Sequence, residues 1–191
     1  MALDSESRWK LVRKLKAKGE EPKRDGEVNI RAALVDDLAA VTEIYDYYIA
    51  NSVVTFDLEA MTVSDWETKF HWIQGLALPF VVAESESKQI LGFAYVAPWR
   101  QKAAYRRTVE DSIYLKPAAT GKRVGTKLLQ ALIEQSKTAG VKEIVAVISD
   151  KGAESSIALH EHFGFKHQGH LGKVGFKFGR WLGTVLMQKS L

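Results

Sequence analysis

TVEDSIYLKPAATGKRVGTKLLQALIEQSKTAG, residues 108–140, is the stretch that decides the fold. Its first part completes a long strand predicted over Tyr105–Leu115, where polar and apolar residues alternate. A turn and a basic loop follow, and then a helix predicted over Gly121–Ala139. Four apolar residues at helical spacing form the inward face of this helix: Val124, Leu128, Leu132 and Ile133. A strand, a loop and a helix in this order predict an α/β domain with a crossover connection.

The loop between this strand and this helix has the composition of an anion site. Backbone N–H groups of such a loop, together with the positive end of the helix, form a nest for a pyrophosphate, and Lys122 and Arg123 add positive charge. The loop is not a Walker motif, because the first glycine of that motif is absent and Arg123 follows Lys122. For the loop alone, a glycine-bounded helix start without a ligand is an equally good interpretation.

The remaining segments are predicted to extend this unit into a mixed sheet. Apolar and alternating runs predict strands at Val28–Leu34, Pro79–Glu84, Ile90–Pro98 and Val141–Ile148, and two more after Phe165, broken at Gly172, Gly175, Gly179 and Gly183. Helical spacing predicts helices after Asp36, after Thr62 and over Ser155–Phe163. Hairpins make the middle of the sheet antiparallel, whereas the two strand–helix–strand crossovers require parallel neighbours. We expect helices on both faces and a ligand at the carboxyl ends of the parallel strands.

Composition limits the class of protein and its chemistry. The chain has 191 residues, of which 46% are hydrophobic and 26% are charged, as expected for one compact domain. It has no cysteine, which excludes a thiol nucleophile and any Cys-ligated zinc or iron–sulfur site and is typical of a reducing compartment. The first residues do not resemble a secretory signal, and the longest apolar stretch, residues 75–83, is far shorter than the ~20 residues of a membrane span. We therefore expect a cytoplasmic protein.

Charge and linker residues divide the chain into an extension, residues 1–27, and a domain, residues 28–191. Arg8 to Lys18 contains six basic residues and no acid, with Trp9, Val12 and Leu15 on one helical stripe. Such a helix suits a membrane surface or nucleic acid, but a solvated appendage that rests one stripe on the domain is the more ordinary interpretation. The domain has a net charge of only +2, which argues against a general nucleic-acid binder.

In the register Thr120-Gly121-Lys122-Arg123-Val124-Gly125, the loop resembles the acyl-coenzyme-A loop of the GNAT superfamily of N-acetyltransferases, usually Q/R-x-x-G-x-G/A. Six further segments resemble the phosphinothricin and methionine sulfoximine acetyltransferase branch: IRAALVDDLAAVTEIYDYYI, TFDLEAMT, WRQKAAYRRTVEDSIYL, VAVIS, SSIALHEHFGF and VGFKFGRWLGTVLMQ. The resemblance covers residues 28–191. It implies the GNAT fold, a mixed and mostly antiparallel sheet splayed around an acyl-coenzyme-A site, and acetyl-coenzyme A as co-substrate without a metal.

The resemblance also implies which residues bind the coenzyme: Ile113, Tyr114, Leu115, Thr120, Gly121, Lys122, Arg123, Val124, Gly125, Thr126 and Ser155. Three positions depart from the pattern. Thr120 replaces the usual Gln or Arg, Arg123 replaces the middle glycine, and Ala153 replaces an asparagine that contacts the pantetheine arm, where Ser155 or Asp150 offers a substitute. We expect Arg123 to present its amide to phosphate only with a negative φ, and the departures together predict a modest affinity for the coenzyme.

Two proton carriers are predicted for acetyl transfer. Attack on a thioester requires a neutral amine, so a carboxylate within reach, directly or through water, is the expected base. Glu110 matches the acid of the branch's T-V-E-x-S-x-Y strand and shares one strand face with Ser112 and Tyr114, whereas Asp111 points the other way and is a weaker choice. His160 occupies the place of the usual GNAT tyrosine, and it is predicted to act as an acid toward sulfur or as a base toward the amine. A zinc pair of His160 and His162 is excluded by their spacing on a helix.

The resemblance further implies the residues near the acceptor amine: Phe56, Glu59, Trp99, Arg100, Tyr105, Arg106, Lys177 and Trp181. Arginines are apt partners for a carboxylate or phosphinate of the acceptor. Lys177 and Trp181 belong to a tail that in this branch extends to a partner subunit. This tail, with Trp181, Leu182, Val185 and Leu186 close together, is predicted to help form a homodimer.

The sequence favours an N-acetyltransferase that acts by direct attack on the α-amine of a small amino acid or amino-acid-like toxin. Two other functions remain open. One is the same fold acting on a polyamine or a protein amine, for which an acidic acceptor groove is expected. The other is a non-catalytic module that binds an acyl-coenzyme or a partner, which is favoured by Thr120, Arg123 and Ala153 and opposed by the presence of both Glu110 and His160.

Overall fold

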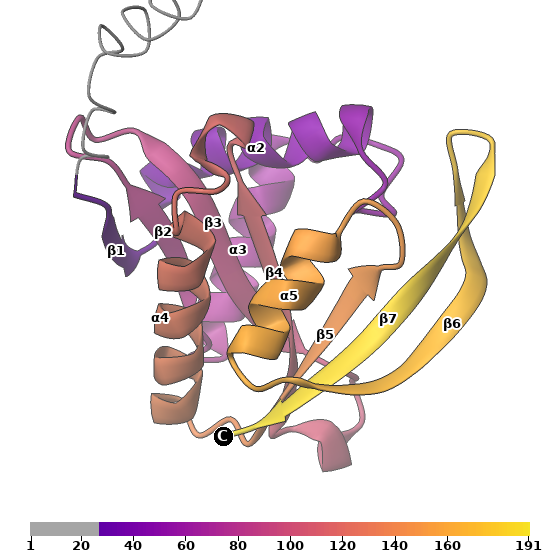
Figure 1. The fold of residues 1–191 in the computed structure, drawn as a ribbon. Helices are drawn as coiled ribbons and strands as arrows, with labels where there is room; N and C mark the ends of the chain where they lie inside the picture. The colour runs from indigo at the N-terminus through magenta and orange to yellow at the C-terminus, as the bar shows by residue number, and fades with distance from the viewer. Residues whose placement is uncertain (1–26) are drawn as a thin grey trace, which may run out of the picture.

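The computed structural model describes residues 27–191, which form a seven-stranded sheet with two helices on each face (Figure 1). The predicted basic extension, except Glu27, lies outside the described residues. The strand order is β1-β2-β3-β4-β5-β7-β6. The strands are β1 (Asn29–Ala32), β2 (Phe80–Glu84), β3 (Ile90–Pro98), β4 (Thr108–Leu115), β5 (Glu143–Ser149), β6 (Lys166–Lys177) and β7 (Arg180–Ser190). The mixed α/β sheet predicted from the sequence is confirmed.

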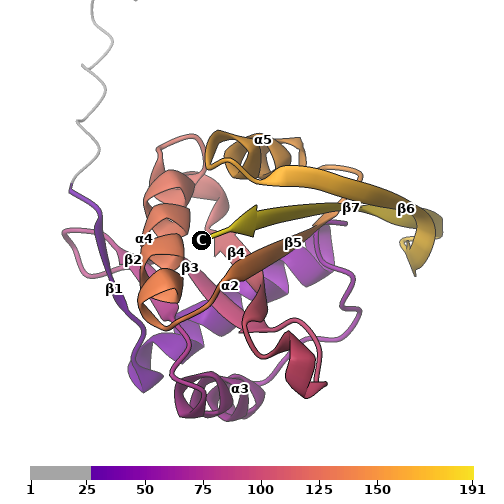
Figure 2. The same cartoon turned by 90° about the horizontal axis from the view of Figure 1, so that it is seen from below.

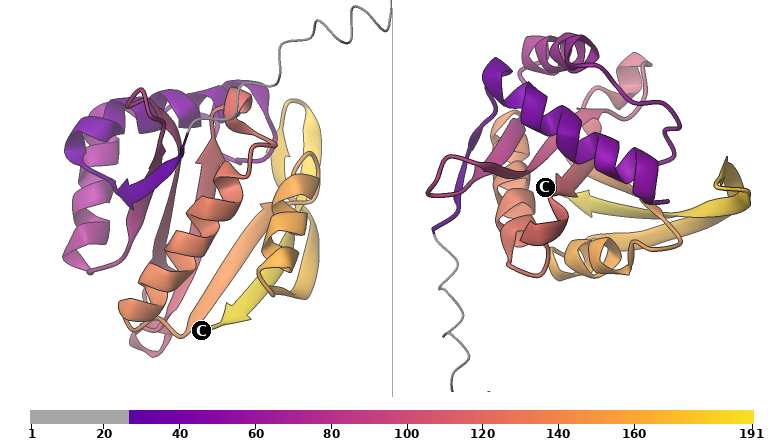
Figure 3. Two further views of the ribbon diagram at one scale, coloured as in Figure 1. Left: turned by 60° about the vertical axis from the view of Figure 1, so that its left-hand side comes forward. Right: turned by 90° about the horizontal axis from the view of Figure 1, so that it is seen from above.

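Within the described part of the chain, four α-helices cover the sheet: α2 (Leu38–Asn51), α3 (Val63–Gly75), α4 (Val124–Thr138) and α5 (Glu154–His162). Helix α3 begins as predicted, with a capping box in which the Thr62 hydroxyl accepts from the Asp65 N–H (3.2 Å) and the Asp65 carboxylate accepts from the Thr62 N–H (2.8 Å). Views along the sheet show α2 and α3 on one face and α4 and α5 on the other (Figures 2 and 3).

Two separate hydrophobic cores lie on the two faces because strand residues alternate in direction. Val82 and Phe93 pack with Trp66 and Phe70 under α2 and α3, and the neighbouring Val81 and Ala94 pack under α4. The inward face predicted for α4 is confirmed, because Val124, Leu128 and Leu132 are buried and Ile133 packs at the edge of the same core.

Only one crossover produces parallel neighbours. β4 and β5 pair in parallel over three residue pairs, Thr108–Glu110 against Glu143–Val145. The second crossover, through α5, does not, because β7 lies between β5 and β6 and pairs antiparallel with both. The expectation that both crossovers give parallel neighbours is therefore wrong for β6. β7, the second strand of the final hairpin, lies beside β5, where β6 was expected as a parallel neighbour.

The short pairing of β4 with β5 opens the sheet. β4 continues from Asp111 to Leu115 and β5 continues to Ser149, but these two stretches do not pair with each other. β3 keeps pairing with β4, and β7 keeps pairing with β5. The two halves of the sheet therefore diverge toward the carboxyl ends of β4 and β5, as the predicted splayed sheet requires.

The β6–β7 hairpin extends beyond the helical layers (Figure 1). Its turn lies at Phe178 and Gly179, both with positive φ, whereas Gly172, Gly175 and Gly183 lie inside the strands. Gly179 is confirmed as a break, and the β6–β7 register shifts between Leu171 and Gly175, around the predicted break at Gly172. Gly175 has a packing reason instead, because a Cβ there would lie 2.5 Å from the Phe56 ring. Of the four tail residues predicted for a dimer surface, Leu182 is buried in its own chain and Trp181 is exposed.

Candidate active site

A cleft of about 620 Å³ occupies the gap between the diverging strands β4 and β5. The α4 and α5 starts and one residue of α2 complete its walls. Its lining comprises Tyr48, Val54, Glu110, Asp111, Ser112, Ile113, Tyr114, Leu115, Thr120, Gly121, Arg123, Gly125, Thr126, Ala146, Val147, Ile148, Gly152, Ala153, Ser155, Ser156, Leu159 and His160. The cleft therefore contains both predicted proton carriers and lies at the carboxyl ends of the parallel strands.

Most residues predicted to bind a coenzyme line this cleft. Nine of the eleven do so, from β4, from the loop before α4, from the first turn of α4 and from α5. The two others are Val124, which is buried in the core under α4, and Lys122, which is exposed on the loop. A Cβ at Gly125 would make only ordinary van der Waals contacts, at 3.4 Å from Leu159 and 3.5 Å from Leu115.

The loop before α4 adopts left-handed backbone at two places. Gly121 has φ +75°, and Arg123, the residue before the helix, has φ +61°. Arg123 therefore does not have the negative φ that we set as the condition for presenting its amide to phosphate. Arg123 takes a conformation that suits glycine, the residue usual at this place in the family that the loop resembles, at a steric cost of roughly 1–2 kcal/mol. The left-handed turn lies directly before α4, and a turn of this kind at a helix start is typical of an anion nest.

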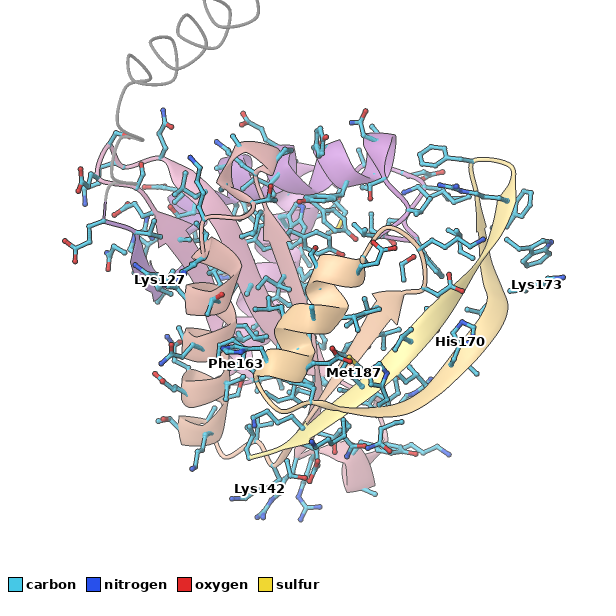
Figure 4. All side chains as sticks on the ribbon, viewed as in Figure 1. Lys127, Lys142, Phe163, His170, Lys173 and Met187 are labelled. Atoms are coloured by element: carbon cyan, nitrogen blue, oxygen red, sulfur yellow. The ribbon has the colours of Figure 1, made fainter. Side chains whose placement is uncertain are left out.

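The start of α5 lacks a capping side chain, because its N-cap is Ala153. Of the two residues offered as substitutes for the missing asparagine, Ser155 lines the cleft. Asp150 does not, since its carboxylate accepts from the Gly183 N–H (2.9 Å) and bonds His170 Nε2 (3.0 Å). His170 itself lies out on the β6–β7 hairpin (Figure 4).

Glu110 is the last residue of β4 that pairs with β5, where the two halves of the sheet begin to diverge. Burial raises the pKa of its carboxyl group, as does the negative charge of Asp111, while the charges of Arg100 and Lys69 act in the opposite direction. The net pKa lies above the ordinary value. No described side chain donates a hydrogen bond to this carboxylate, so it remains available to a ligand.

Asp111 and His160 form a buried pair that sequence reasoning did not foresee. His160 Nε2 lies 3.0 Å from Asp111 Oδ2, and each side chain is only 2% exposed. His160 Nδ1 donates to the Ser156 carbonyl (2.7 Å). Burial by itself lowers the pKa of His160. The Asp111 charge and these hydrogen bonds together raise it by more, so the net pKa lies above the ordinary value. Strand alternation had placed Asp111 on the opposite face from Glu110, which is confirmed.

None of the eight predicted acceptor residues lines the cleft. Two small groups form instead. Phe56 packs on Gly175 of β6, and the buried Lys177 donates from Nζ to the Thr55 carbonyl (2.9 Å) of the same chain. Burial lowers the pKa of Lys177. Lys177 thus packs against its own chain, while Trp181 nearby stays exposed and contacts Phe176 edge-on at 5.4 Å between ring centroids.

The second group lies in the loop between β3 and β4. The Arg100 guanidinium stacks over the Trp99 ring at 4.8 Å and is close enough to influence Glu110. Tyr105 and Arg106 are exposed in the same loop, and Glu59 is exposed after α2 without a described contact to either group. The structure therefore brings Arg100 toward Glu110 but does not gather the eight residues into one pocket.

Lys69 on α3 was missed by sequence reasoning because no motif marks it. Its Nζ donates to the Tyr95 hydroxyl (2.7 Å) and lies over the Trp66 and Tyr95 rings at 5.1 and 4.6 Å. It lowers the pKa of Glu110 from the face opposite Asp111. The only sequence signal was a lysine one turn after Trp66, which is ordinary for a helix surface.

Within residues 27–191, no group of three or more His, Asp or Glu side chains is placed to hold a metal ion. No helix in this part of the chain is long and apolar enough to cross a membrane.

Comparisons with known proteins agree with this geometry. A family model described as the acetyltransferase (GNAT) family matches residues 41–165. The chain is 38% identical over 162 residues to a phosphinothricin N-acetyltransferase from Alcaligenes faecalis, covering 85% of this chain and 82% of the relative. It is 35% identical over 163 residues to an L-methionine sulfoximine/L-methionine sulfone acetyltransferase from Pseudomonas aeruginosa, covering 85% and 94%. A GNAT superfamily phosphinothricin acetyltransferase from Sinorhizobium meliloti, solved with AcCoA, superposes with a TM-score of 0.82 at 41% identity, covering 86% and 88%.

The left-handed Arg123 has a measurable effect on stability. Arg123→Gly relieves the steric cost and should be more stable to chemical unfolding than Arg123→Ala by about 1 kcal/mol. Both variants lose the same guanidinium charge, so their difference reports the backbone alone. Equal stabilities in urea titrations would show that Arg123 is not held in this conformation in solution.

Proposed function

The chain belongs to the acetyltransferase (GNAT) family, and from this premise we propose that it transfers acetyl from acetyl-coenzyme A to the α-amine of a small amino acid or amino-acid-like toxin. The observation that supports this most is the cleft between β4 and β5, which combines the basic loop, the α4 start and Glu110. Relatives that act on phosphinothricin and on methionine sulfoximine support the acceptor class. The proposed catalytic domain comprises residues 28–191.

The residues present fit acetyl-coenzyme A as co-substrate. Gly121 and Arg123 give the loop its left-handed backbone, and the α4 start adds the positive end of a helix dipole for the pyrophosphate. Apolar side chains of Ile113, Leu115 and Leu159 line the adjoining part of the cleft, where a pantetheine arm would lie. The relative from Sinorhizobium meliloti was solved with AcCoA.

Glu110 is the proposed general base. In a ternary complex the acceptor amine attacks the thioester carbonyl, the C–N bond forms and the C–S bond breaks, and the amine proton passes to the Glu110 carboxylate directly or through water. His160 is less suited to this role because both ring nitrogens face acceptors, the Ser156 carbonyl and Asp111. Protonation of the departing thiolate is the second role that we propose for His160, and it requires Nε2 to exchange its hydrogen bond to Asp111 for one to the sulfur.

Arg100 supports an anionic acceptor over a polyamine. It is the predicted acceptor residue that lies near Glu110, and a guanidinium attracts the carboxylate that an amino acid carries next to its amine. A polyamine needs an acidic groove, for which the described cleft offers Glu110 and Asp111, and Asp111 is already paired with His160. A non-catalytic binding module is disfavoured because the carboxylate at Glu110 is partly buried at the cleft yet unpartnered.

The first test of this function measures coenzyme binding and turnover together. Acetyl-coenzyme A at one hundred times its dissociation constant should stabilise the folded protein by about 2.7 kcal/mol, and free pantetheine analogues should stabilise it less because they lack the pyrophosphate. Thermal shift measures the binding. Thiol release with a panel of amino acids, polyamines and peptides identifies the acceptor. No thermal response at millimolar coenzyme would contradict the proposal.

Replacement of Glu110 separates the two proton carriers. Glu110→Gln keeps the shape but cannot accept a proton, so turnover should fall by roughly 10²–10⁴. In the unmodified protein, activity should fall as pH falls through the pKa of Glu110, and this acidic limb should lie above the ordinary glutamate value because the pKa is raised. The pH–rate profile of the variant should lack that limb.

His160→Phe serves as the comparison. It should keep the acidic limb and slow the departure of the thiol, an effect that shrinks with a more acidic leaving thiol. Loss of the limb in His160→Phe and its retention in Glu110→Gln would assign the base to His160 instead.

We also propose a homodimer in which the β6–β7 hairpin contributes to the interface, and a cytoplasmic location, for which the absence of cysteine is the support. Five apolar side chains on this hairpin are about half exposed or more: Leu171, Val174, Phe176, Phe178 and Trp181. Light scattering at micromolar concentration should give twice the mass of the chain, and Phe176→Ser with Trp181→Ser should halve it. A fully active monomer in the unmodified protein would exclude the dimer.

A further inference from the structure

The environment of His160 has a consequence for its protonation. The Ser156 carbonyl can only accept a hydrogen bond, so Nδ1 of His160 carries a proton. Nε2 then faces the Asp111 carboxylate at 3.0 Å. With Asp111 ionised, Nε2 must also carry a proton, and the ring is an imidazolium.

The burial of Asp111 means that its ionised form needs a positive charge beside it. Its Oδ1 is buried without a hydrogen-bond partner among the described residues, and its Oδ2 faces only His160. An ionised carboxylate with so little compensation is costly inside a protein unless a positive charge lies beside it. A protonated His160 supplies that charge.

No other charged group of the cleft is placed to take over this task. Glu110 precedes Asp111 on β4 but points to the opposite face, and β3 presents the uncharged Val96 opposite Asp111. β5 contributes Ala146, Val147 and Ile148 to the cleft, and Arg123 lines it from the loop before α4 without a described contact to the pair. On α5, Glu161 and His162 are exposed to solvent.

The pair also joins β4 and α5, between which no other side-chain hydrogen bond or ion pair is described. Asp111 belongs to the part of β4 that has left β5, and His160 belongs to α5, the nine-residue helix whose start lacks a capping side chain. The His160 ring further packs edge-on against Phe165 at 4.8 Å between centroids. The ion pair thus fixes one wall of the cleft against the other.

We propose that Asp111 is a positioning residue of the cleft: its carboxylate holds His160 as an imidazolium and thereby fixes α5 against β4 in the orientation that binds the coenzyme. The coenzyme part of this inference rests on the proposed function, whereas the protonation of His160 does not. Because the pKa of His160 is raised, the pair is fully formed below about pH 6.5 and is lost as pH rises through that raised pKa. Coenzyme affinity should therefore decline at alkaline pH.

Asp111→Asn tests the pair in the full chain without ligand. Asparagine keeps the shape but not the charge, so His160 should lose one ring proton at a lower pH in nitrogen-detected NMR titrations. Hydrogen exchange of α5 amides should also become faster. Glu161→Gln is the matched control, because it neutralises a carboxylate of the same helix that bonds an exposed histidine, His167 at 2.8 Å. It should leave both measurements unchanged.

The coenzyme arm uses calorimetric titration with acetyl-coenzyme A between pH 6 and pH 9.5. Asp111→Asn should weaken binding by about tenfold at pH 7 and lose the alkaline decline, a size typical of coupling between neighbouring groups. Glu161→Gln should bind within about twofold of the unmodified protein. If the unmodified protein does not bind the coenzyme, the proposed function fails, and NMR and hydrogen exchange still decide whether Asp111 charges His160 and fixes α5.

A second variant covers the case in which Asp111→Asn does not fold. His160→Gln leaves a lone buried carboxylate, and adding Asp111→Asn to it should raise the melting temperature again, because the uncompensated charge is gone. A neutral His160 at pH 7 in the unmodified protein would overturn the proposal. So would unchanged exchange and binding in Asp111→Asn, or a double variant less stable than His160→Gln.

Discussion

The early end of the parallel pairing between β4 and β5 is the constraint on which the rest of the structure depends. After Glu110 and Val145 the two strands separate, although each keeps its antiparallel neighbour. The two separated strands leave a gap in the middle of the sheet, and the helices that follow these strands form its walls. α4 follows β4 and α5 follows β5, and their starts therefore lie at the mouth of the gap.

The same separation explains why acidic neighbours in sequence have different chemistry. Glu110 lies where β4 and β5 begin to separate, and its carboxylate has no hydrogen-bond partner within residues 27–191. Asp111 is the next residue and faces the other layer, where His160 of α5 meets it. One peptide bond thus divides a carboxylate available for proton transfer from one committed to an ion pair.

Much of the fold follows from local rules, and the site follows from them only in part. The capping box at Thr62 and the apolar stripe of α4 depend on neighbours a few residues apart, so periodicity locates them. The contact of Asp111 with His160 joins residues 49 positions apart, and no local pattern contains it. The contact of Lys177 with the Thr55 carbonyl is also absent from any local pattern, because these residues lie 122 positions apart.

Arg123 shows a different limit, since a side chain's own preference predicts a negative φ there. The loop nevertheless has to turn between η3 (Pro117–Ala119) and α4, and its geometry prevails over the preference of one residue. The position of β7 between β5 and β6 could not be predicted from the sequence either. Chain order indicates which strands exist but does not determine which of two hairpin strands takes the inner place.

The two hydrophobic cores lie on opposite faces of the strands they share, and Leu78, just before β2, packs against both. The molecule therefore resembles two half-domains joined along the sheet. The cleft opens the sheet where it is least paired. Its walls include Tyr48 and Tyr114, which pack at the edge of one core, and Ile113 and Leu159, which pack at the edge of the other. A molecule held there touches both halves at once. Such a molecule acts as a removable cross-link between the two halves. Its binding should therefore make the two halves unfold more cooperatively, as a single unit.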